Sequence, residues 1–246
     1  MDRSKPIRRR TAITAAAVIA VVALCALLPA AAAADTSSLT LVASPEVIAY
    51  NGASVLTGTL MNTTTATAVG GEAILVESGP AATGPWTTVA VISTLNGTPE
   101  YSTGTYTLVV RPRDKTFYRM RFLGMTGLDA AGSAAVSVTP KVYLSRPQVP
   151  TSVLHGQRFA VVGYIQPKHP KGLRTVVKFK FYRNVRGKWV LKMARWGKTS
   201  NYLNFTKVTR ATSIKQPGKW KVKSFAPADA LHAASTSAFS KVIRVR

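Results

Sequence analysis

Short alternations of polar and apolar residues recur along the chain after residue 35, and they predict strands. In residues 116–123, for example, Tyr118, Met120 and Phe122 fall on one side, while charged residues alternate with them. A period of two is typical of a strand that buries one face. Clusters of glycine, proline and asparagine separate such runs at intervals of about ten residues. With no capped helical periodicity between them, the runs predict an all-β chain of antiparallel sandwiches.

The same pattern occurs twice. An aromatic-led strand followed by a Leu-x-Ala-Ala segment is found at residues 117–131 and again at 218–234. Leu128 and Leu231 are 103 positions apart, and so are Trp86 and Trp189. Two separate matches at one offset indicate a tandem duplication of about 100 residues. We therefore expect two β-sandwich domains, at residues 35–140 and 141–246.

The matched positions are expected to serve the interior of each copy. Tyr118 corresponds to Trp220, and we expect Trp220 and Trp189 to lie in the core of the second unit. Leu128 and Leu231 are expected at a core or corner position in their own copies. His232 is expected in a turn or at an edge, because Asp129 takes its place in the first copy.

Residues 1–34 have the composition of a secretory signal peptide. Five basic residues precede an uncharged apolar stretch at 12–28, and Ala32 and Ala34 form an Ala-x-Ala site. We expect an N-terminal signal helix that is cleaved after Ala34, and a secreted or cell-surface protein. The alternative is an uncleaved membrane anchor, since residues 12–34 are just long enough to span a bilayer. Only in that case would the membrane be a partner.

The one cysteine, Cys25, lies within this N-terminal segment. The mature chain is therefore expected to contain no disulfide bond, no thiolate nucleophile and no thiolate metal site.

Charge distinguishes the two copies. Residues 35–140 contain five basic and seven acidic residues, a net charge of −2. Residues 141–246 contain 23 basic residues and one acid, Asp229, a net charge of +22. Such a balance favours association with polyanions by counterion release. The alternative is a solvated surface that keeps the domain in solution.

Lysines occupy alternate positions of the predicted strands of the second unit. This pattern predicts a basic sheet face, and we expect its polyanion-binding residues to be Lys178, Lys180, Lys188, Lys192, Lys219, Lys221 and Lys223. Trp196 and Tyr202 lie in a stretch rich in Gly, Lys, Ser and Asn. They are candidates for stacking on sugar rings, although a loop aromatic can also fold onto its own domain.

Catalytic and metal-binding patterns are missing from the sequence. Glu72 and Glu77 are five positions apart, so they fall on opposite faces of a strand, which is poor geometry for an acid–base pair. There is no His-x-x-x-His pair, no cysteine cluster and no Gly-x-Ser-x-Gly motif. We therefore expect a protein that is not an enzyme and that uses no metal and no cofactor.

Several local motifs carry a family resemblance. Asn51-Gly52, Pro85-Trp86 and the run Thr116-Phe-Tyr-Arg-Met-Arg-Phe-Leu-Gly resemble the immunoglobulin-like repeats of secreted and wall-associated bacterial proteins, especially actinobacterial ones. The resemblance covers nearly all of residues 36–246. It implies immunoglobulin-like sandwiches that act as extracellular spacers, adhesive modules or carbohydrate-contacting modules without a catalytic site. The second unit departs from it where Trp220-Lys221 replaces Tyr118-Arg119.

Two hypotheses for function follow. In the first, the basic second domain adheres to anionic cell-envelope, cell-wall or extracellular polymers or polysaccharides. In the second, the protein is a structural spacer or a protein-interaction module with no ligand of its own. Sequence-specific recognition of nucleic acid is not favoured, because no helical reader and no RNA-binding aromatic motif is present.

Overall fold

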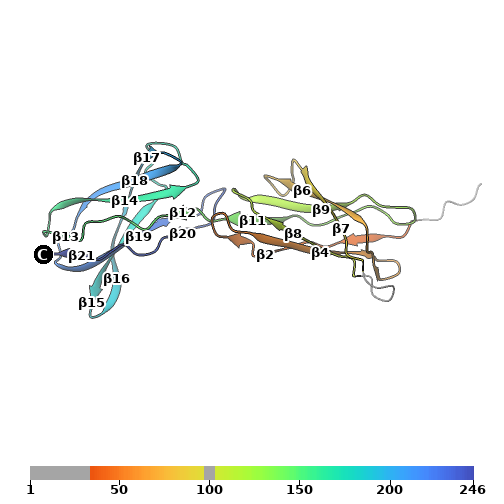
Figure 1. Ribbon diagram of the computed structural model, residues 1–246, viewed down its shortest axis with the longest axis horizontal. Coiled ribbons are helices and arrows are strands. Elements are labelled where there is room, and N and C mark those ends of the chain that lie inside the picture. The colour runs from red at the N-terminus through yellow and green to blue at the C-terminus, as the bar shows by residue number, and fades with distance from the viewer. Residues whose placement is uncertain (1–33, 97–102) are drawn as a thin grey trace, which may run out of the picture.

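The computed structural model describes residues 34–96 and 103–246, and this part of the chain is built from strands without a helix. The strands form two β-sandwiches that lie end to end along the long axis of the molecule (Figure 1). The all-β prediction is confirmed. The expected signal helix falls outside the described residues.

The first sandwich has one sheet centred on β4 and a second sheet in the order β3-β11-β9-β6-β7. In the first sheet, the central strand is β4 (Ser54–Asn62). The strands that pair with it are β1 (Ser37–Leu39), β2 (Val42–Ser44), β5 (Thr67–Ala68) and β8 (Thr105–Val110). The second contains β3 (Val47–Ile48), β6 (Ala73–Gly79), β7 (Thr87–Ser93), β9 (Thr116–Phe122), β10 (Ala131–Gly132) and β11 (Val136–Pro140).

The second sandwich has sheets in the orders β12-β14-β18-β17 and β13-β21-β19-β15-β16. The four-stranded sheet contains β12 (Tyr143–Leu144), β14 (Arg158–Gln166), β17 (Lys198–Tyr202) and β18 (Phe205–Ser213). The other, which we call the lysine sheet, contains β13 (Ser152–Val153), β15 (Lys178–Val185), β16 (Lys188–Trp196), β19 (Gly218–Ala226), β20 (Ser235–Thr236) and β21 (Ile243–Val245).

Both sandwiches use the same connections. The short strands β3 and β13 pair in parallel with the closing strands β11 and β21, whereas the other named strands pair antiparallel. A register shift also occurs at the same place in both, between Val76 and Glu77 and between Phe181 and Tyr182. Two sheets with this strand order form an immunoglobulin-like sandwich. The duplication in the sequence is thus a duplication of one fold.

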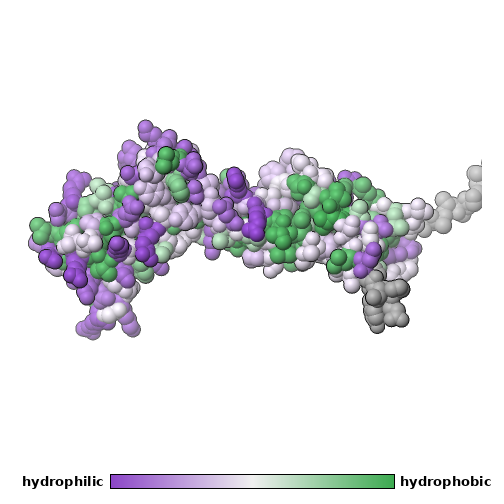
Figure 2. Space-filling model, viewed as in Figure 1, coloured by the Kyte–Doolittle hydropathy of each residue, from purple (hydrophilic) through white to green (hydrophobic). Residues whose placement is uncertain are grey.

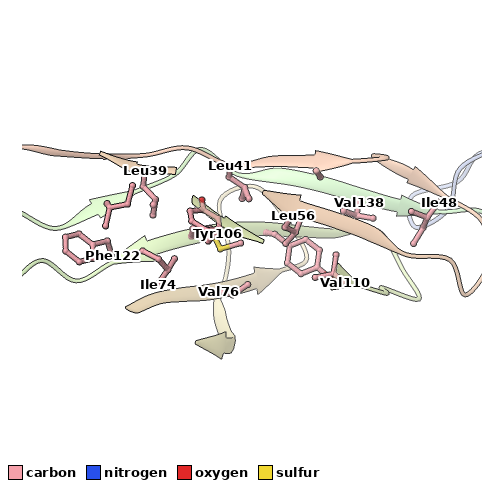
Figure 3. Close-up of a cluster of buried hydrophobic side chains, with 14 of the residues drawn as sticks. Leu39, Leu41, Ile48, Leu56, Ile74, Val76, Tyr106, Val110, Phe122 and Val138 are labelled. Carbon is pink, nitrogen blue, oxygen red and sulfur yellow. The ribbon is translucent and has the colours of Figure 1, made fainter. Parts of the chain in front are cut away.

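Each sandwich has its own core of inward-facing residues. In the first, the ring of Tyr106 lies between the sheets together with Leu56 and Val76 (Figure 3). Met120 belongs to the same core. In the second, Phe179 and Phe181 of β15 pack with Trp220 of β19, which is 3% exposed. The expectation for Trp220 is therefore confirmed.

The core prediction fails at Leu231. Leu128 is buried, but Leu231 is 49% exposed, and the neighbouring His232 is buried in its place. The reason is that this loop of the second unit lies against the first unit. The amide of Lys115 donates to the carbonyl of Leu231 at 2.8 Å, and His232 Nε2 lies 3.4 Å from Asp114 Oδ1. We call these contacts the junction. His232, which was expected in a turn or at an edge, is therefore a buried residue at the contact between the two units.

Residues 34–96 and 103–246 contain no helix long and apolar enough to cross a membrane.

Candidate functional site

The outer face of the lysine sheet is the most distinctive surface of the second unit. On β19, Trp220, Val222 and Ser224 point into the core, so Lys219, Lys221 and Lys223 point outward. On β15, Phe179 and Phe181 are buried, which leaves Lys178 and Lys180 on the same outer face. The period-two pattern thus places five lysines on one side of two neighbouring strands.

The strand register brings like charges directly opposite each other. Lys180 faces Lys223 across β15 and β19, and Lys219 faces Arg244 across β19 and β21. Facing residues of an antiparallel pair have Cβ atoms about 4.5–5.5 Å apart, and like charges there are destabilising. The face is therefore arranged at a cost in folding free energy.

Aromatic rings lie beneath four of these ammonium groups. Lys178 Nζ is 4.3 Å from the ring centroid of Trp196, and Lys180 Nζ is 3.7 Å from that of Phe225. Cation–π contacts of this kind contribute about 0.5–1 kcal/mol at exposed sites. They hold each charge at a defined place while leaving its outer side open to solvent.

Phe239 lies at the centre of a second group of contacts. Its ring centroid is 4.2 Å from Lys223 Nζ and 5.2 Å from the ring of Tyr182, edge to face. Lys221 Nζ lies 4.6 Å from the ring of Trp189, which in turn lies 6.3 Å from Phe239. We call the whole set the lysine–aromatic face, which comprises Lys178, Lys180, Lys219, Lys221, Lys223, Tyr182, Trp189, Trp196, Phe225 and Phe239.

The prediction that Trp189 belongs to the core is wrong. Trp189 is only partly buried and lies on the outer face, beneath Lys221. The first unit has the same arrangement, because the guanidinium of Arg119 lies 4.6 Å from the ring of Trp86. The tryptophan that the duplication repeats is thus a platform for a cation, not an interior residue.

The two copies differ in what neutralises that cation. In the first unit, Glu77 faces Arg119 across β6 and β9, and Glu77 Oε2 accepts a hydrogen bond from Arg119 Nε at 2.6 Å. In the second unit, Tyr182 faces Lys221 at the equivalent place. Among the described residues, no carboxylate oxygen lies within 4.0 Å of a lysine of the lysine–aromatic face.

The single acid of the second unit is engaged elsewhere. Asp229 lies in the loop after β19, where its Oδ1 accepts hydrogen bonds from the amides of Leu231 and His232, at 2.8 and 2.7 Å. Partial burial alone would raise the pKa of this carboxyl. Those two hydrogen bonds and the nearby His232 ring outweigh it and hold the pKa below its usual value.

Two of the lysines predicted from the sequence occupy a different setting. Lys188 lies at the start of β16 opposite Val185, and Lys192 is the extra residue of the register shift. Both are exposed on the edge strand of the sheet. Charged residues and bulges at such an edge prevent pairing with other strands. That gives these two lysines an explanation that needs no ligand.

The structure does not bring Trp196 and Tyr202 together. Trp196 ends β16 in the lysine sheet, while Tyr202 lies on β17 in the opposite sheet and packs against Tyr164, with ring centroids 5.2 Å apart. The chain passes from one sheet to the other at Gly197, between two strands that are adjacent in sequence.

Sequence reasoning missed Phe239 and Arg244. Residues 237–242 form no strand, so no alternation marks Phe239 as an outward residue. Arg244 lies beside the basic face because it pairs in register with Lys219, which the sequence alone does not show. The described residues contain no group of three or more His, Cys, Asp or Glu side chains that could hold a metal ion.

The chain is therefore a pair of immunoglobulin-like β-sandwiches in which the second copy carries an unneutralised basic face. It is similar to the solved structure of an ICAM-5 D1-D4 ectodomain fragment, with a TM-score of 0.44 and 12% sequence identity. The match covers 84% of this chain and 53% of the other, so the chain spans about half the length of that ectodomain fragment. No family model and no curated protein matches the sequence.

Proposed function

We propose that the protein is a secreted, non-enzymatic immunoglobulin-like protein of bacterial, actinobacterial type, and that its second unit associates with anionic cell-envelope or extracellular polymers. The observation that carries this proposal is the facing pair Lys180 and Lys223, which has no carboxylate within 4.0 Å among the described residues. The N-terminal segment and the family resemblance support the location and the type of protein.

The first unit supplies an internal comparison. A sheet face that serves only solubility can balance its charges, as Glu77 and Arg119 do in the first copy. The second copy has the same fold and also has a cation, Lys221, over the equivalent tryptophan, but a tyrosine in place of the acid. Since unpaired like charges lower stability, a ligand that neutralises them offers a reason for this substitution.

The binding mode follows from the spacing of the charges. Alternate residues of a strand are about 6.6 Å apart, so the lysines of β15 and β19 form two parallel rows. A flexible polymer with phosphate or carboxylate groups can contact several of them at once and release the condensed counterions. Binding of this kind depends strongly on salt and only weakly on the detailed structure of the polymer.

The test is retention of the chain beginning at Asp35 on isolated wall polymer, on DNA and on a neutral glycan, over a series of salt concentrations. We expect retention on both polyanions at low salt, with a steep loss as the salt concentration rises. Any retention on the neutral glycan should not depend on salt. Replacing Lys219, Lys221 and Lys223 with glutamate should abolish most of it. Circular dichroism of the variant checks that the fold is kept.

Two results would overturn the proposal. Absence of retention on every polyanion at low salt would leave the spacer or protein-interaction function as the better account. Unchanged retention of the charge-reversed variant would show that another surface makes the contact.

A further inference from the structure

The opposite sheet of the second unit carries a shallow pocket on its outer face. The pocket has a volume of about 310 Å³, and we call it the tyrosine pocket; its lining residues are Tyr143, Ser145, Gln148, Tyr164, Tyr202 and Phe205. None of the six is charged, which separates this site from the lysine–aromatic face on the other side of the sandwich.

The sheet positions the aromatic rings by register. Tyr202 of β17 faces Phe205 of β18, and both flank Tyr164 of the neighbouring strand β14. The ring of Tyr164 lies 5.2 Å from that of Tyr202, tilted by 46°, and 6.2 Å from that of Phe205, at 71°. Three rings on adjacent strands therefore form one wall of the pocket, and Tyr143 of β12 adds a fourth.

Two of the four rings are exposed to solvent. Tyr143 and Tyr202 are 43% and 44% exposed. Tyrosine presents an apolar ring and a polar hydroxyl, so it suits a surface that alternates between contact with a ligand and contact with water.

Unused hydrogen-bonding groups surround these rings. Within the described residues, the hydroxyls of Tyr143, Tyr164 and Tyr202 and the side-chain amide of Gln148 make no hydrogen bond to the protein. Ser145 Oγ is already used, because it accepts from the amide of Tyr164 at 2.8 Å. The pocket thus offers apolar ring faces and four free polar groups at its rim.

We propose that the tyrosine pocket binds the pyranose rings of a polysaccharide. A pyranose has an apolar C–H face that packs on an aromatic ring, and a rim of hydroxyl groups that both donate and accept hydrogen bonds. Since no lining residue is charged, the contact is made with the sugar ring itself. The shallow, open form of the pocket suits a polymer that passes across the sheet. This site does not depend on the function proposed above.

The test is a titration of the ¹⁵N-labelled chain from Asp35 with soluble oligosaccharides of glucose, N-acetylglucosamine, mannose and xylose, followed by NMR. At least one of them should shift the amide signals of Tyr164, Tyr202 and Phe205 in a saturable way at millimolar concentration. Tyr202→Ala should weaken that binding about tenfold, whereas Tyr202→Trp, which keeps a ring, should retain it.

Trp196→Ala is the matched control, because it removes an aromatic ring from the opposite sheet. It should leave the titration unchanged, as should neutralising the lysines of the lysine–aromatic face. The proposal is overturned if none of the four sugars moves the pocket signals. It is equally overturned if Tyr202→Ala binds as tightly as the unaltered chain.

Discussion

At the scale of single residues, a substitution in one copy can be compared with the same substitution at the matching position of the other copy. Gly58 of β4 faces Tyr106 of β8, whose hydroxyl donates to the carbonyl of Thr40 across the strand (Figure 3 shows the Tyr106 ring in the core). A Cβ atom on Gly58 would collide with both of these groups. In the second copy, Gly163 faces Val208, and its Cβ would meet Phe179 and Ser224 Oγ at 3.3 Å, which is tight but tolerable.

We therefore expect Gly58→Ala to lower the free energy of unfolding by about 3 kcal/mol and Gly163→Ala by about 1 kcal/mol. Urea denaturation of the two variants measures both values. Equal costs, or a larger cost at Gly163, would contradict the role given to Tyr106.

Tyr182 marks the difference between the copies most directly. Tyr182→Glu would restore a carboxylate opposite Lys221, as Glu77 lies opposite Arg119. We expect the affinity for a phosphate polymer to fall by about tenfold, because the new pair neutralises part of the face.

Two variants separate the possible causes of that fall. Gln157→Glu adds the same charge at an exposed turn away from the face, and its carboxylate can still accept from the amide of Leu154. Tyr182→Gln removes the ring without adding charge. If either variant lowers the affinity as much as Tyr182→Glu, the missing carboxylate opposite Lys221 is not what allows the face to bind.

At the scale of strands and loops, alternation was enough to predict most elements, and two landmarks at one offset predicted the repeat. It failed on β16, where Trp189, Val190 and Leu191 follow one another, so the sequence does not show which of them faces inward. The register shift beside Tyr182 then places Trp189 outside. The separation of Trp196 from Tyr202 was also beyond the sequence, since one glycine connects strands of different sheets.

Asp229 in the loop after β19 should make the stability of the second unit depend on pH. The pKa of Asp229 is lowered in the folded chain, so its contribution to stability is present above the pKa of the unfolded state and is lost as the pH falls. Between about pH 5 and pH 2, we expect the second unit to lose more stability than the same unit with Asp229→Asn. The side-chain oxygen of that asparagine still accepts both hydrogen bonds. Thermal unfolding across this range is the measurement. Parallel profiles for the two proteins would show that the carboxylate has no such role.

At the scale of the whole molecule, the two units differ in surface more than in fold. In the view of Figure 2, hydrophobic side chains gather on the first unit, whereas hydrophilic ones predominate on the second. The exposed valines of the first unit include Val42, Val55 and Val109, on three neighbouring strands. Duplication supplied one scaffold, and the outward positions diverged.

The junction couples the two units through a small number of contacts. Because Asp114 lies beside the buried His232, we expect Asp114→Ala to let the units reorient more freely. NMR relaxation should then give more dissimilar rotational correlation times for the two units. Asp129→Ala, which removes an acid from another loop of the first unit, should leave them unchanged. Identical values in all three proteins would show that the Asp114 contact does not hold the units together.

The central claim is that one basic face binds polyanions, and the salt dependence of binding tests it most directly. The measurement compares a variant with Lys178, Lys180, Lys221 and Lys223 changed to glutamine against one with the same change at Lys168, Lys171, Lys198 and Lys215, which lie off the face. On a phosphate polymer, the slope of log K against log salt should fall by about 3 in the first variant and by less than about 1 in the second. An equal fall in both would show that net charge alone governs binding, and the account of the lysine–aromatic face would be wrong.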